Sequence, residues 1–315
     1  MGQYHVNVAV GLSEQYDVVG LYDLSEERRN EISGRFGVEP YGDMDELIAR
    51  SDAIVVAVPT VHHYEVAKKA LTTGKHVLVE MPITETVAQA RELVDLADSN
   101  GLILQVGHVE RFNGAVLELN KIVTEPLFIE SRRLAPFNPR ISDVGVVLDL
   151  MIHDLDIVVN LVKSEVTDVH ARGLTAFSGH EDIAAATLQF ENGCVAVLNA
   201  SRATQSKVRT LTISEQNAYI VLDFTTQDID IHRQAASNYL MTRGELKYKQ
   251  ESFVEKIFVH KDNPLRQEHL HFVSCIRGEA EPIVKGESDI RTLQIAGDLL
   301  AQVRESKIGS PAGDQ

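Results

Sequence analysis

A short aliphatic segment, GVVLDLMIHDLDIV (residues 145–158), carries a carboxylate and an imidazole four positions apart, Asp149 and His153. On a helix, side chains spaced three and four positions apart lie on one face, and Asp156 and Asn160 continue this spacing. A solvent-facing stripe would more often carry Lys, Glu or Arg, which favour helices more strongly. The pattern therefore favours the wall of a cleft. The alternative is a partly exposed stripe with satisfied hydrogen bonds.

The Asp149–His153 pair is suited to removing a proton from a substrate hydroxyl. An unperturbed imidazole titrates near neutral pH, so His153 can act as a general base. Asp149 can orient that imidazole or hold the substrate hydroxyl. Proton removal of this kind accompanies hydride transfer from an alcohol to a nicotinamide cofactor. We therefore expect Asp149 and His153 to be catalytic.

The first 107 residues alternate apolar strands with amphipathic helices. The predicted strands are Asp17–Tyr22, Ala53–Val58, His76–Val79 and Leu102–Val106. The predicted helices are SEERRNEISGRF with Ser25 as its N-cap, Val61–Leu71 and Thr84–Ser99. This alternation is typical of a parallel sheet covered on both faces. We expect an α/β fold that begins with a Rossmann-type dinucleotide-binding domain over residues 1–121.

Residues 122–315 have a different pattern. A predicted helix over Val144–Lys163 precedes several strand-like segments joined by short turns such as ENG at 191–193, which is typical of an antiparallel sheet. The predicted strands are Val166–Gly173, Ile183–Phe190, Cys194–Ala200, Val208–Ser214, Tyr219–Phe224 and Ile229–His232. Two helices, over 265–277 and 287–304, follow. We expect an α+β domain built on an open antiparallel sheet.

A dinucleotide-binding domain normally begins with a strand and G-x-G-x-x-G, whose glycines let backbone amides approach a pyrophosphate. This chain begins with Met1-Gly2 and a helix-like segment, QYHVNVAVGL. We expect Gly2 to be the last glycine of the fingerprint, and Asp23, 21 residues later, to be the ribose-binding acid. The first strand and most of the loop are then missing, and the neighbouring strands lose their partners. The alternative is that Met1 is a true start, residues 1–12 form a surface helix and Asp23 is a turn residue.

Charge and composition exclude several classes of partner. The formal net charge of −16 argues against a nucleic acid or an anionic membrane as the main partner, although a helix N-terminus can still hold an anionic small ligand. No apolar run approaches the roughly 20 residues that cross a bilayer, and the N-terminus lacks a signal-peptide layout. Cys194 and Cys275 have no metal-like spacing, and His269 and His271 point to different helix faces. We expect a cytoplasmic protein without a bound metal.

Five motifs are spread along the chain: VPTVHHYEVAKKAL (58–71), GKHVLVEMPIT (74–84), LQVGHVERFN (104–113), GVVLDLMIHDLDIV (145–158) and PLRQEHLHFVSCIRGEAEPIV (264–284). In residues and order they resemble the glucose–fructose oxidoreductase / inositol dehydrogenase family over nearly the whole chain. The resemblance implies a Rossmann domain, bound NAD(H) or NADP(H), and a C-terminal open sheet that forms a homodimer or homotetramer interface. The implied substrate is a sugar, cyclitol or nucleotide sugar, and the chain is most similar to members of the UDP-N-acetylglucosamine 3-dehydrogenase type.

The family's usual catalytic set is the Lys of Glu-Lys-Pro plus an Asp and a His four residues apart. Asp149 and His153 match the second pair, whereas Met81 stands at the Lys position between Glu80 and Pro82. A thioether cannot titrate here and serves only to pack. Either His153 carries proton transfer alone, or this chain binds its ligand without efficient turnover, as the family's galactose-pathway transcriptional repressor does.

The resemblance and the residues together give a set of expected binding positions. The expected cofactor-binding residues are Gly2, Asp23, Pro59, Thr60, His63, Glu80, Met81 and Pro82. The expected substrate-binding residues, in a cleft between the domains, are His108, Arg111, Asn113 and Asp156. Arg28 and Arg29 could meet a 2′-phosphate, but Asp23 would repel it, which favours NAD over NADP. The basic segment SRRLAPFNPR (131–140) could meet the diphosphate of a nucleotide sugar; the alternative is a lid or surface loop.

Overall fold

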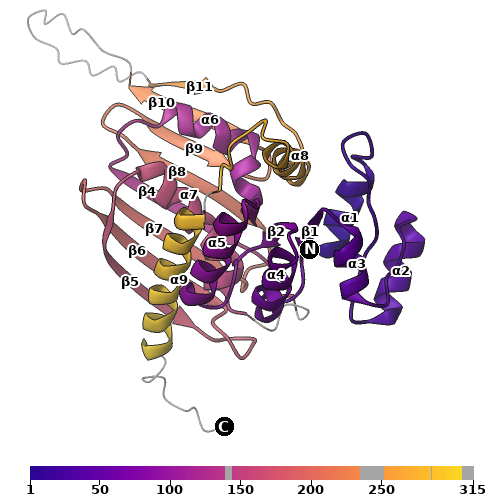
Figure 1. The fold of residues 1–315 in the computed structure, drawn as a ribbon. Helices are drawn as coiled ribbons and strands as arrows, with labels where there is room; N and C mark the ends of the chain where they lie inside the picture. Colours follow the sequence, from indigo (N-terminus) through magenta and orange to yellow (C-terminus); the bar gives the residue numbers. More distant parts are fainter. Residues whose placement is uncertain (139–143, 235–251, 285, 307–315) are drawn as a thin grey trace, which may run out of the picture. The chain divides into compact units, whose positions relative to one another are not determined.

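The computed structural model describes residues 1–138, 144–234, 252–284 and 286–306, and its contacts divide the chain into two compact units (Figure 1). Unit 1 consists of Met1–Phe112 and Asp262–Gln294, and unit 2 consists of Asn113–Lys261 and Ile295–Gln315. This division differs from the predicted boundary after residue 121. The chain returns to unit 1 because helix α8 (Pro264–Ile276) packs against α1 (Gly2–Val10) and η2 (Val109–Phe112).

Unit 1 contains a three-stranded parallel sheet in the order β1-β2-β3, as the alternating pattern predicts. The strands are β1 (Ala53–Val56), β2 (His76–Glu80) and β3 (Leu104–Gly107). The remaining helices of this unit are α2 (Glu26–Phe36), α3 (Met44–Arg50), η1 (Thr60–His62), α4 (His63–Thr72), α5 (Val87–Asn100) and the first part of α9 (Gly286–Ser306).

The two faces of β2 have different chemistry because successive side chains of a strand point to opposite sides. Val77 and Val79 lie in the main hydrophobic core of unit 1, where α4 packs on the sheet. On the opposite face, Glu80 contacts helix α1 and Gln105 of the adjacent strand contacts helix α8. The last residue of β2, Glu80, therefore has a buried side-chain carboxylate.

The predicted strand Asp17–Tyr22 is wrong. In the described part of the chain this segment forms only an isolated bridge between Leu21 and Pro40. A strand needs a continuous hydrogen-bonded neighbour, and β propensity alone does not supply one.

Capping residues set the helix starts. Ser25 caps α2, because its hydroxyl accepts from the backbone N–H of Arg28, as predicted. The helix predicted to begin at Thr84 instead begins at Val87, since Thr86 is the N-cap and accepts from the N–H of Gln89. Within the described residues, no helix combines the length and apolarity that a bilayer crossing requires.

Unit 2 is built on an eight-stranded sheet in the order β11-β10-β9-β8-β4-β7-β6-β5. The strands are β4 (Phe128–Leu134), β5 (Val166–Leu174), β6 (Ile183–Phe190), β7 (Val195–Ser201), β8 (Val208–Ser214), β9 (Tyr219–Asp223), β10 (Asp228–Gln234) and β11 (Ser252–Lys256). Strands β5 to β10 confirm the predicted set, whereas β4 and β11 were not predicted. The predicted antiparallel sheet is in fact mixed, because β4 pairs parallel with β7. The α/β fold class with a second α+β domain is confirmed.

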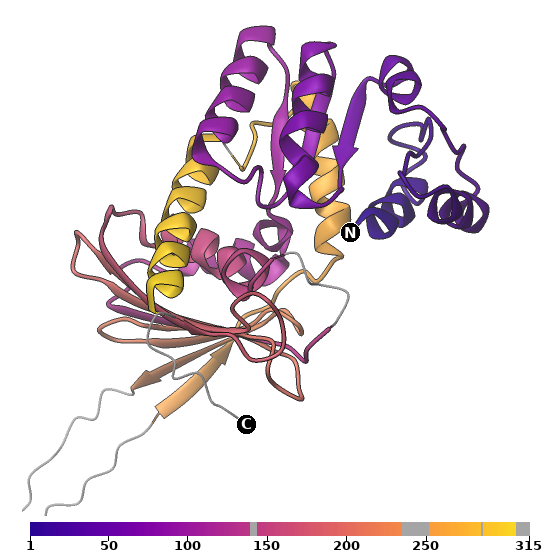
Figure 2. The same cartoon turned by 90° about the horizontal axis from the view of Figure 1, so that it is seen from below.

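One face of the large sheet is covered by the unit's own helices (Figure 2). Helix α7 (Ile152–Val162) packs against β4 and β7, and α6 (Gly114–Ile122) packs against β10. Along β6, Ala184, Ala186 and Leu188 are buried while the intervening residues are exposed. This alternation is the pattern of a sheet with one packed face and one solvated face.

A glycine begins the helical segment that carries Asp149. A Cβ at Gly145 would overlap the carboxylate of Glu181, which accepts from the backbone N–H of Val147 at 3.2 Å. We expect Gly145→Ala to displace Glu181 and lower the free energy of unfolding by about 1–3 kcal/mol, as overpacking does. Urea denaturation measures this change. Gly179→Ala is the matched control, because a Cβ there meets open space, and equal stability of the two variants would contradict the expectation.

Candidate functional site

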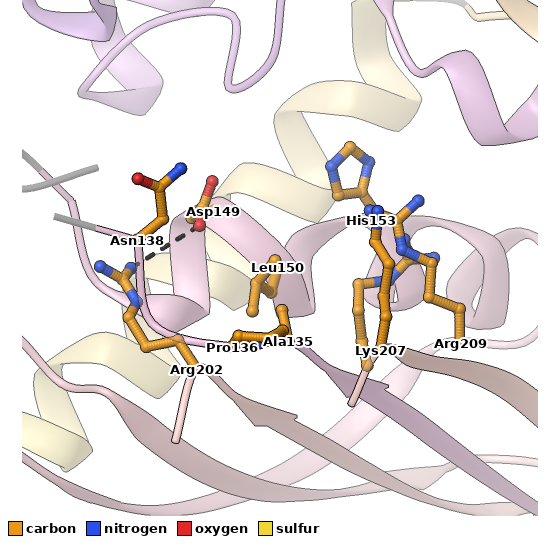
Figure 3. A pocket seen from close by; sticks show the side chains of 10 residues that line it. Ala135, Pro136, Asn138, Asp149, Leu150, His153, Arg202, Lys207 and Arg209 are labelled. Carbon is orange, nitrogen blue, oxygen red and sulfur yellow. Dashed lines mark ion pairs between the residues drawn. The ribbon is translucent and has the colours of Figure 1, made fainter. Parts of the chain in front are cut away.

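A pocket of about 390 Å³ in unit 2 contains both predicted catalytic side chains (Figure 3). Asp149 and His153 share this pocket, as their spacing on one helical face predicts. The lining residues are Arg133, Ala135, Pro136, Asn138, Asp149, Leu150, His153, Arg202, Lys207 and Arg209. The pocket is thus formed by one helical segment and by residues of β4, β7 and β8 or directly beside them. The catalytic role of the pair stays a prediction.

Asp149 lies in a π-helical turn rather than in the regular helix predicted over Val144–Lys163. This turn, η3 (Val147–Met151), is followed by α7, and the N–H of Ile152 donates to the carbonyl of Val147. Single π-helical turns within helices occur frequently at functional sites. His153 follows in the first turn of α7.

Asp149 is paired with an arginine from the end of β7. Oδ2 of Asp149 lies 3.7 Å from Nη2 of Arg202, which also donates to the carbonyl of Val144 at 2.8 Å. The Arg202 side chain is 4% exposed, whereas that of Asp149 is 26% exposed. The carboxylate is therefore accessible from the pocket while its cationic partner is held in the protein.

A buried carboxylate, Asp182, organises the loop beside Arg202. Its Oδ1 lies 3.9 Å from Nε of Arg202, and its Oδ2 accepts from the backbone N–H groups of Ala176, Phe177 and Ser178. Burial alone would raise the pKa of Asp182, but these donors and the hydroxyl of Ser178 lower it to about 2. The carboxylate is ionised near neutral pH and faces Arg202 as a fixed charge.

A second buried pair anchors α7 to the sheet. Asp154 accepts from Nη2 and Nε of Arg133 at 2.6 and 2.9 Å, and from the hydroxyl of Ser131 at 3.0 Å. Both members of the ion pair are at most 2% exposed, so their hydrogen bonds must offset the cost of desolvation. The basic segment 131–140, expected to meet a diphosphate or, alternatively, to form a lid or surface loop, begins as strand β4, whose Ser131 and Arg133 are buried. Pro139 and Arg140 lie outside the described residues.

Three cationic side chains of the pocket were not predicted from the sequence. Arg202, Lys207 and Arg209 come from the end of β7, the following loop and the start of β8. In Figure 3, Lys207 and Arg209 lie near His153, and Arg202 lies near Asp149. A signal was present in SRATQSKVR (201–209), which is basic in an acidic chain. Only the sheet shows that these residues face the helix with Asp149.

Two predicted substrate residues of unit 2 are engaged in local hydrogen bonds. Asp156 is 1% exposed, does not line the pocket, and accepts from Nδ2 of Asn160 at 3.3 Å. Asn113 is the N-cap of α6, and its amide donates to the carbonyl of Phe224 at 3.1 Å. These contacts favour structural roles, and their substrate role stays a prediction.

Two further predicted substrate residues, His108 and Arg111, tie together segments of unit 1. Nε2 of His108 lies 2.6 Å from Oδ1 of Asp289, and both side chains are buried. Arg111 donates to the carbonyl of Ile283 at 3.1 Å and to Ser288 at 3.4 Å. Both residues therefore fasten the loop after β3 to the segment around α9. Substrate contact by either residue remains untested.

The predicted cofactor residues of unit 1 divide into exposed and buried groups. Asp23, Thr60 and Met81 are partly exposed, so they can still contact a ligand. Gly2 is the first residue of α1, and Pro59 precedes η1. Glu80, Pro82 and His63 are buried.

His63 supports two loops rather than presenting its ring to a ligand. It is 1% exposed, and its ring nitrogens lie 2.8 Å from the carbonyl oxygen of Pro82 and 2.9 Å from that of Val58. Both partners only accept, and a neutral imidazole donates to only one of them. His63 thereby links the turns that follow β1 and β2.

Comparison with known proteins gives two consecutive matches along the chain. Residues 1–108 match the model of an oxidoreductase family with an NAD-binding Rossmann fold, and residues 123–221 match the GFO/IDH/MocA C-terminal domain. UDP-N-acetylglucosamine 3-dehydrogenase from Acidithiobacillus ferrooxidans is 32% identical over 83% of this chain and 87% of that protein. scyllo-Inositol 2-dehydrogenase (NAD(+)) from Bacillus subtilis is 23% identical over 90% of this chain and 85% of that protein.

The fold agrees with the same relative. A solved structure of the Acidithiobacillus ferrooxidans UDP-N-acetylglucosamine 3-dehydrogenase, GnnA, superposes with a TM-score of 0.87 at 30% identity. The match covers 97% of this chain and 95% of that chain. The similarity therefore includes both units.

The charge of Asp182 can be tested through its pH dependence. A carboxyl with a depressed pKa stabilises the fold above its unfolded pKa near 4, and this contribution is lost as pH falls towards the folded value of about 2. We expect Asp182→Asn to cost about 1.5–3 kcal/mol near neutral pH, the usual value of charged hydrogen bonds, and progressively less below pH 4. Denaturation at several pH values measures the difference. The exposed Asp168→Asn is the control, and a difference independent of pH would argue against an ionised Asp182.

Proposed function

Because this chain belongs to the GFO/IDH/MocA family of oxidoreductases with an NAD-binding Rossmann fold, we propose that it is an NAD-dependent dehydrogenase of a nucleotide sugar. The reaction is hydride transfer at a ring carbinol or ketone. A plain sugar is the broader form of the same substrate class. The observation that carries the proposal is the single pocket that brings Asp149 and His153 together with several cations.

His153 and Asp149 divide the work on the substrate. His153 takes the hydroxyl proton in oxidation, or returns it in reduction, because an imidazole can exchange a proton near neutral pH. Asp149 accepts a hydrogen bond from a substrate hydroxyl through the exposed part of its carboxylate, and Arg202 holds that carboxylate in place. When bound, the nicotinamide ring accepts or supplies the hydride.

The positive charge of the pocket supports a phosphorylated substrate. Lys207 and Arg209 line it, in addition to Arg202, which pairs with Asp149, although the chain as a whole has a formal net charge of −16. Guanidinium and ammonium groups are the usual partners of phosphate oxygens. A neutral sugar would not need this concentration of cations. The UDP-sugar named for the Acidithiobacillus relative supplies a diphosphate of the required charge.

The residues of unit 1 fit the ribose and nicotinamide parts of the cofactor. Parallel strands of this fold bind ligands beyond their carboxyl ends, where Pro59 and Thr60 follow β1 and Met81 and Pro82 follow β2. Asp23, partly exposed before α2, would hold the adenosine ribose, and its charge would repel a 2′-phosphate. We therefore propose NAD rather than NADP. At the pyrophosphate, Gly2 offers the N-terminus of α1.

A second function is favoured by Met81. Its side chain packs against the hydrophobic core of unit 1 and offers no titrating group where the family places a lysine. The alternative is therefore a non-catalytic or weakly active protein that binds the same class of ligand. In either case we propose a homodimer or homotetramer, with the solvated face of the eight-stranded sheet as the interface.

The catalytic role of His153 predicts a large loss of turnover. Reduced-nicotinamide absorbance is followed with NAD and a panel of sugars and UDP-sugars. We expect UDP-sugars to be turned over best, and His153→Asn to lower kcat by about 10²–10⁴, as loss of a general base does. His170→Asn changes an exposed histidine of the same unit and serves as the control. Absence of turnover by the wild-type protein with every substrate would remove the proposal.

The choice between the two functions predicts the result of Met81→Lys. If His153 suffices for proton transfer, the new lysine should change kcat by less than about tenfold, with Met81→Leu as the control for packing. A gain of about 10²–10⁴ would instead favour the weakly active alternative, because a polarising group at this position contributes that much. The same absorbance assay decides between them.

A further inference from the structure

A line of four polar side chains crosses the interior of unit 1 and ends at the turn after β2. The hydroxyl of Tyr16 lies 2.8 Å from Nδ1 of His269, and Nε2 of His269 lies 2.9 Å from Nδ1 of His5. Nε2 of His5 lies 2.6 Å from Oε1 of Glu80, whose Oε2 accepts from the backbone N–H of Met81 at 3.3 Å. These contacts connect helices α1 and α8 to the turn that carries Met81.

Burial determines the protonation states of Tyr16 and His269. His269 is 3% exposed and His5 is 4% exposed. Burial raises the pKa of Tyr16 to about 12, so its hydroxyl keeps its proton near neutral pH. Burial, followed by the neighbouring His5, lowers the pKa of His269 to about 3, so this imidazole is neutral. The hydroxyl can therefore donate, and the His269 ring has one N–H group and one acceptor nitrogen.

A second buried carboxyl group, Glu268, interacts with Glu80, and only one of the two carries a negative charge. Glu268 is fully buried, and among the described residues neither of its carboxyl oxygens has a hydrogen-bond partner. Burial and then the charge of Glu80 raise the pKa of Glu268 well above its usual range. Two buried carboxyl groups that repel each other cannot both ionise at low cost, so Glu268 keeps its proton and the negative charge lies on Glu80.

The carboxylate at one end and the hydroxyl at the other are consistent with hydrogen bonds that all run in one direction. The carboxylate of Glu80 only accepts, so His5 donates to it from Nε2, and Nδ1 of His5 faces Nε2 of His269. If Nε2 of His269 donates to that nitrogen, Nδ1 of His269 is the acceptor for the hydroxyl of Tyr16. We propose that the four side chains form a one-directional hydrogen-bond chain, with both imidazoles as Nε2–H tautomers, which positions the turn at Met81.

The effect on turnover rests on the proposed function, whereas the hydrogen-bond chain does not. Met81 and Pro82 are the residues through which the turn would contact the cofactor. His5 and His269 act on them only through Glu80, so they are positioning residues. If the hydrogen-bond chain is interrupted, the backbone N–H of Met81 loses its fixed acceptor. Small misplacements of a reacting group can cost about 10²-fold in rate.

The tautomers are tested by NMR on protein labelled with ¹⁵N-histidine near neutral pH. We expect two rings with a protonated Nε2 and an unprotonated, hydrogen-bonded Nδ1. Their signals are assigned by their loss in His5→Gln and His269→Gln. Either ring found as an imidazolium or as the Nδ1–H tautomer would overturn the proposal, whether or not the protein is an active enzyme.

The positioning role is tested with a conservative and a disruptive variant. In His269→Gln the amide can donate to His5 and accept from Tyr16, whereas His269→Leu can do neither. With ¹³C-methyl methionine labels, the Met81 signal should move in the Leu variant and stay close to wild type in the Gln variant. Met151 of unit 2 is the internal reference. Tyr41→Phe removes the hydroxyl of a buried residue that is not part of the hydrogen-bond chain, and it should leave the Met81 signal unchanged.

Turnover separates the two proposals. In an active protein, kcat should fall by about 10- to 100-fold in His269→Leu and recover in His269→Gln. Equal losses in both variants, or a Met81 signal that moves equally in both, would overturn the positioning role. Absence of activity in the wild-type protein would count against the proposed function alone, because the two NMR measurements would still decide on the hydrogen-bond chain.

Discussion

A carboxylate that leaves water must find hydrogen-bond donors inside the protein, and both units are organised around this constraint. In unit 1, Glu80 is buried at the end of β2 and is held by His5 and by the backbone of Met81. In unit 2, Asp154 takes its donors from β4, and Asp182 takes them from a loop. Glu80 thus lies beside Met81, Asp154 lies beside His153 in the sequence, and Asp182 faces Arg202. The positions of these residues depend on buried negative charges.

The sequence predicted most of what depends on local pattern. The alternating residues of β5 to β10 and the cap at Ser25 were sufficient to place those elements. The segment Asp17–Tyr22 has a strand-like composition, but in the described residues it forms only an isolated bridge, because a strand depends on a neighbour and not on composition alone. Strand β4 was missed for the opposite reason. Its arginines were interpreted as a possible diphosphate contact or a lid or surface loop, because the buried partner of Arg133, Asp154, lies on another element.

The candidate site shows the same division. The four-residue spacing of Asp149 and His153 was readable directly, and both residues line one pocket. The cations of that pocket were not predicted, since Arg202 and Arg209 come from strands that meet only in the sheet. Conversely, Asp156 lies on the predicted helical stripe but is buried, because the stripe extends along the helix beyond the residues that line the pocket. Spacing identifies a face of a helix, and only packing decides which part of that face is accessible.

The single parallel pairing of the large sheet has a consequence for how unit 2 folds. Strands β7 and β8 are consecutive along the chain, yet β4 lies between them. The sheet therefore cannot form by adding one hairpin after another. It consists of two meanders, β5-β6-β7 and β8-β9-β10-β11, each with short-range contacts, which are joined only by a strand made much earlier in synthesis. Because distant pairings are formed slowly, insertion of β4 would be the late step that unites the two halves and completes the pocket floor.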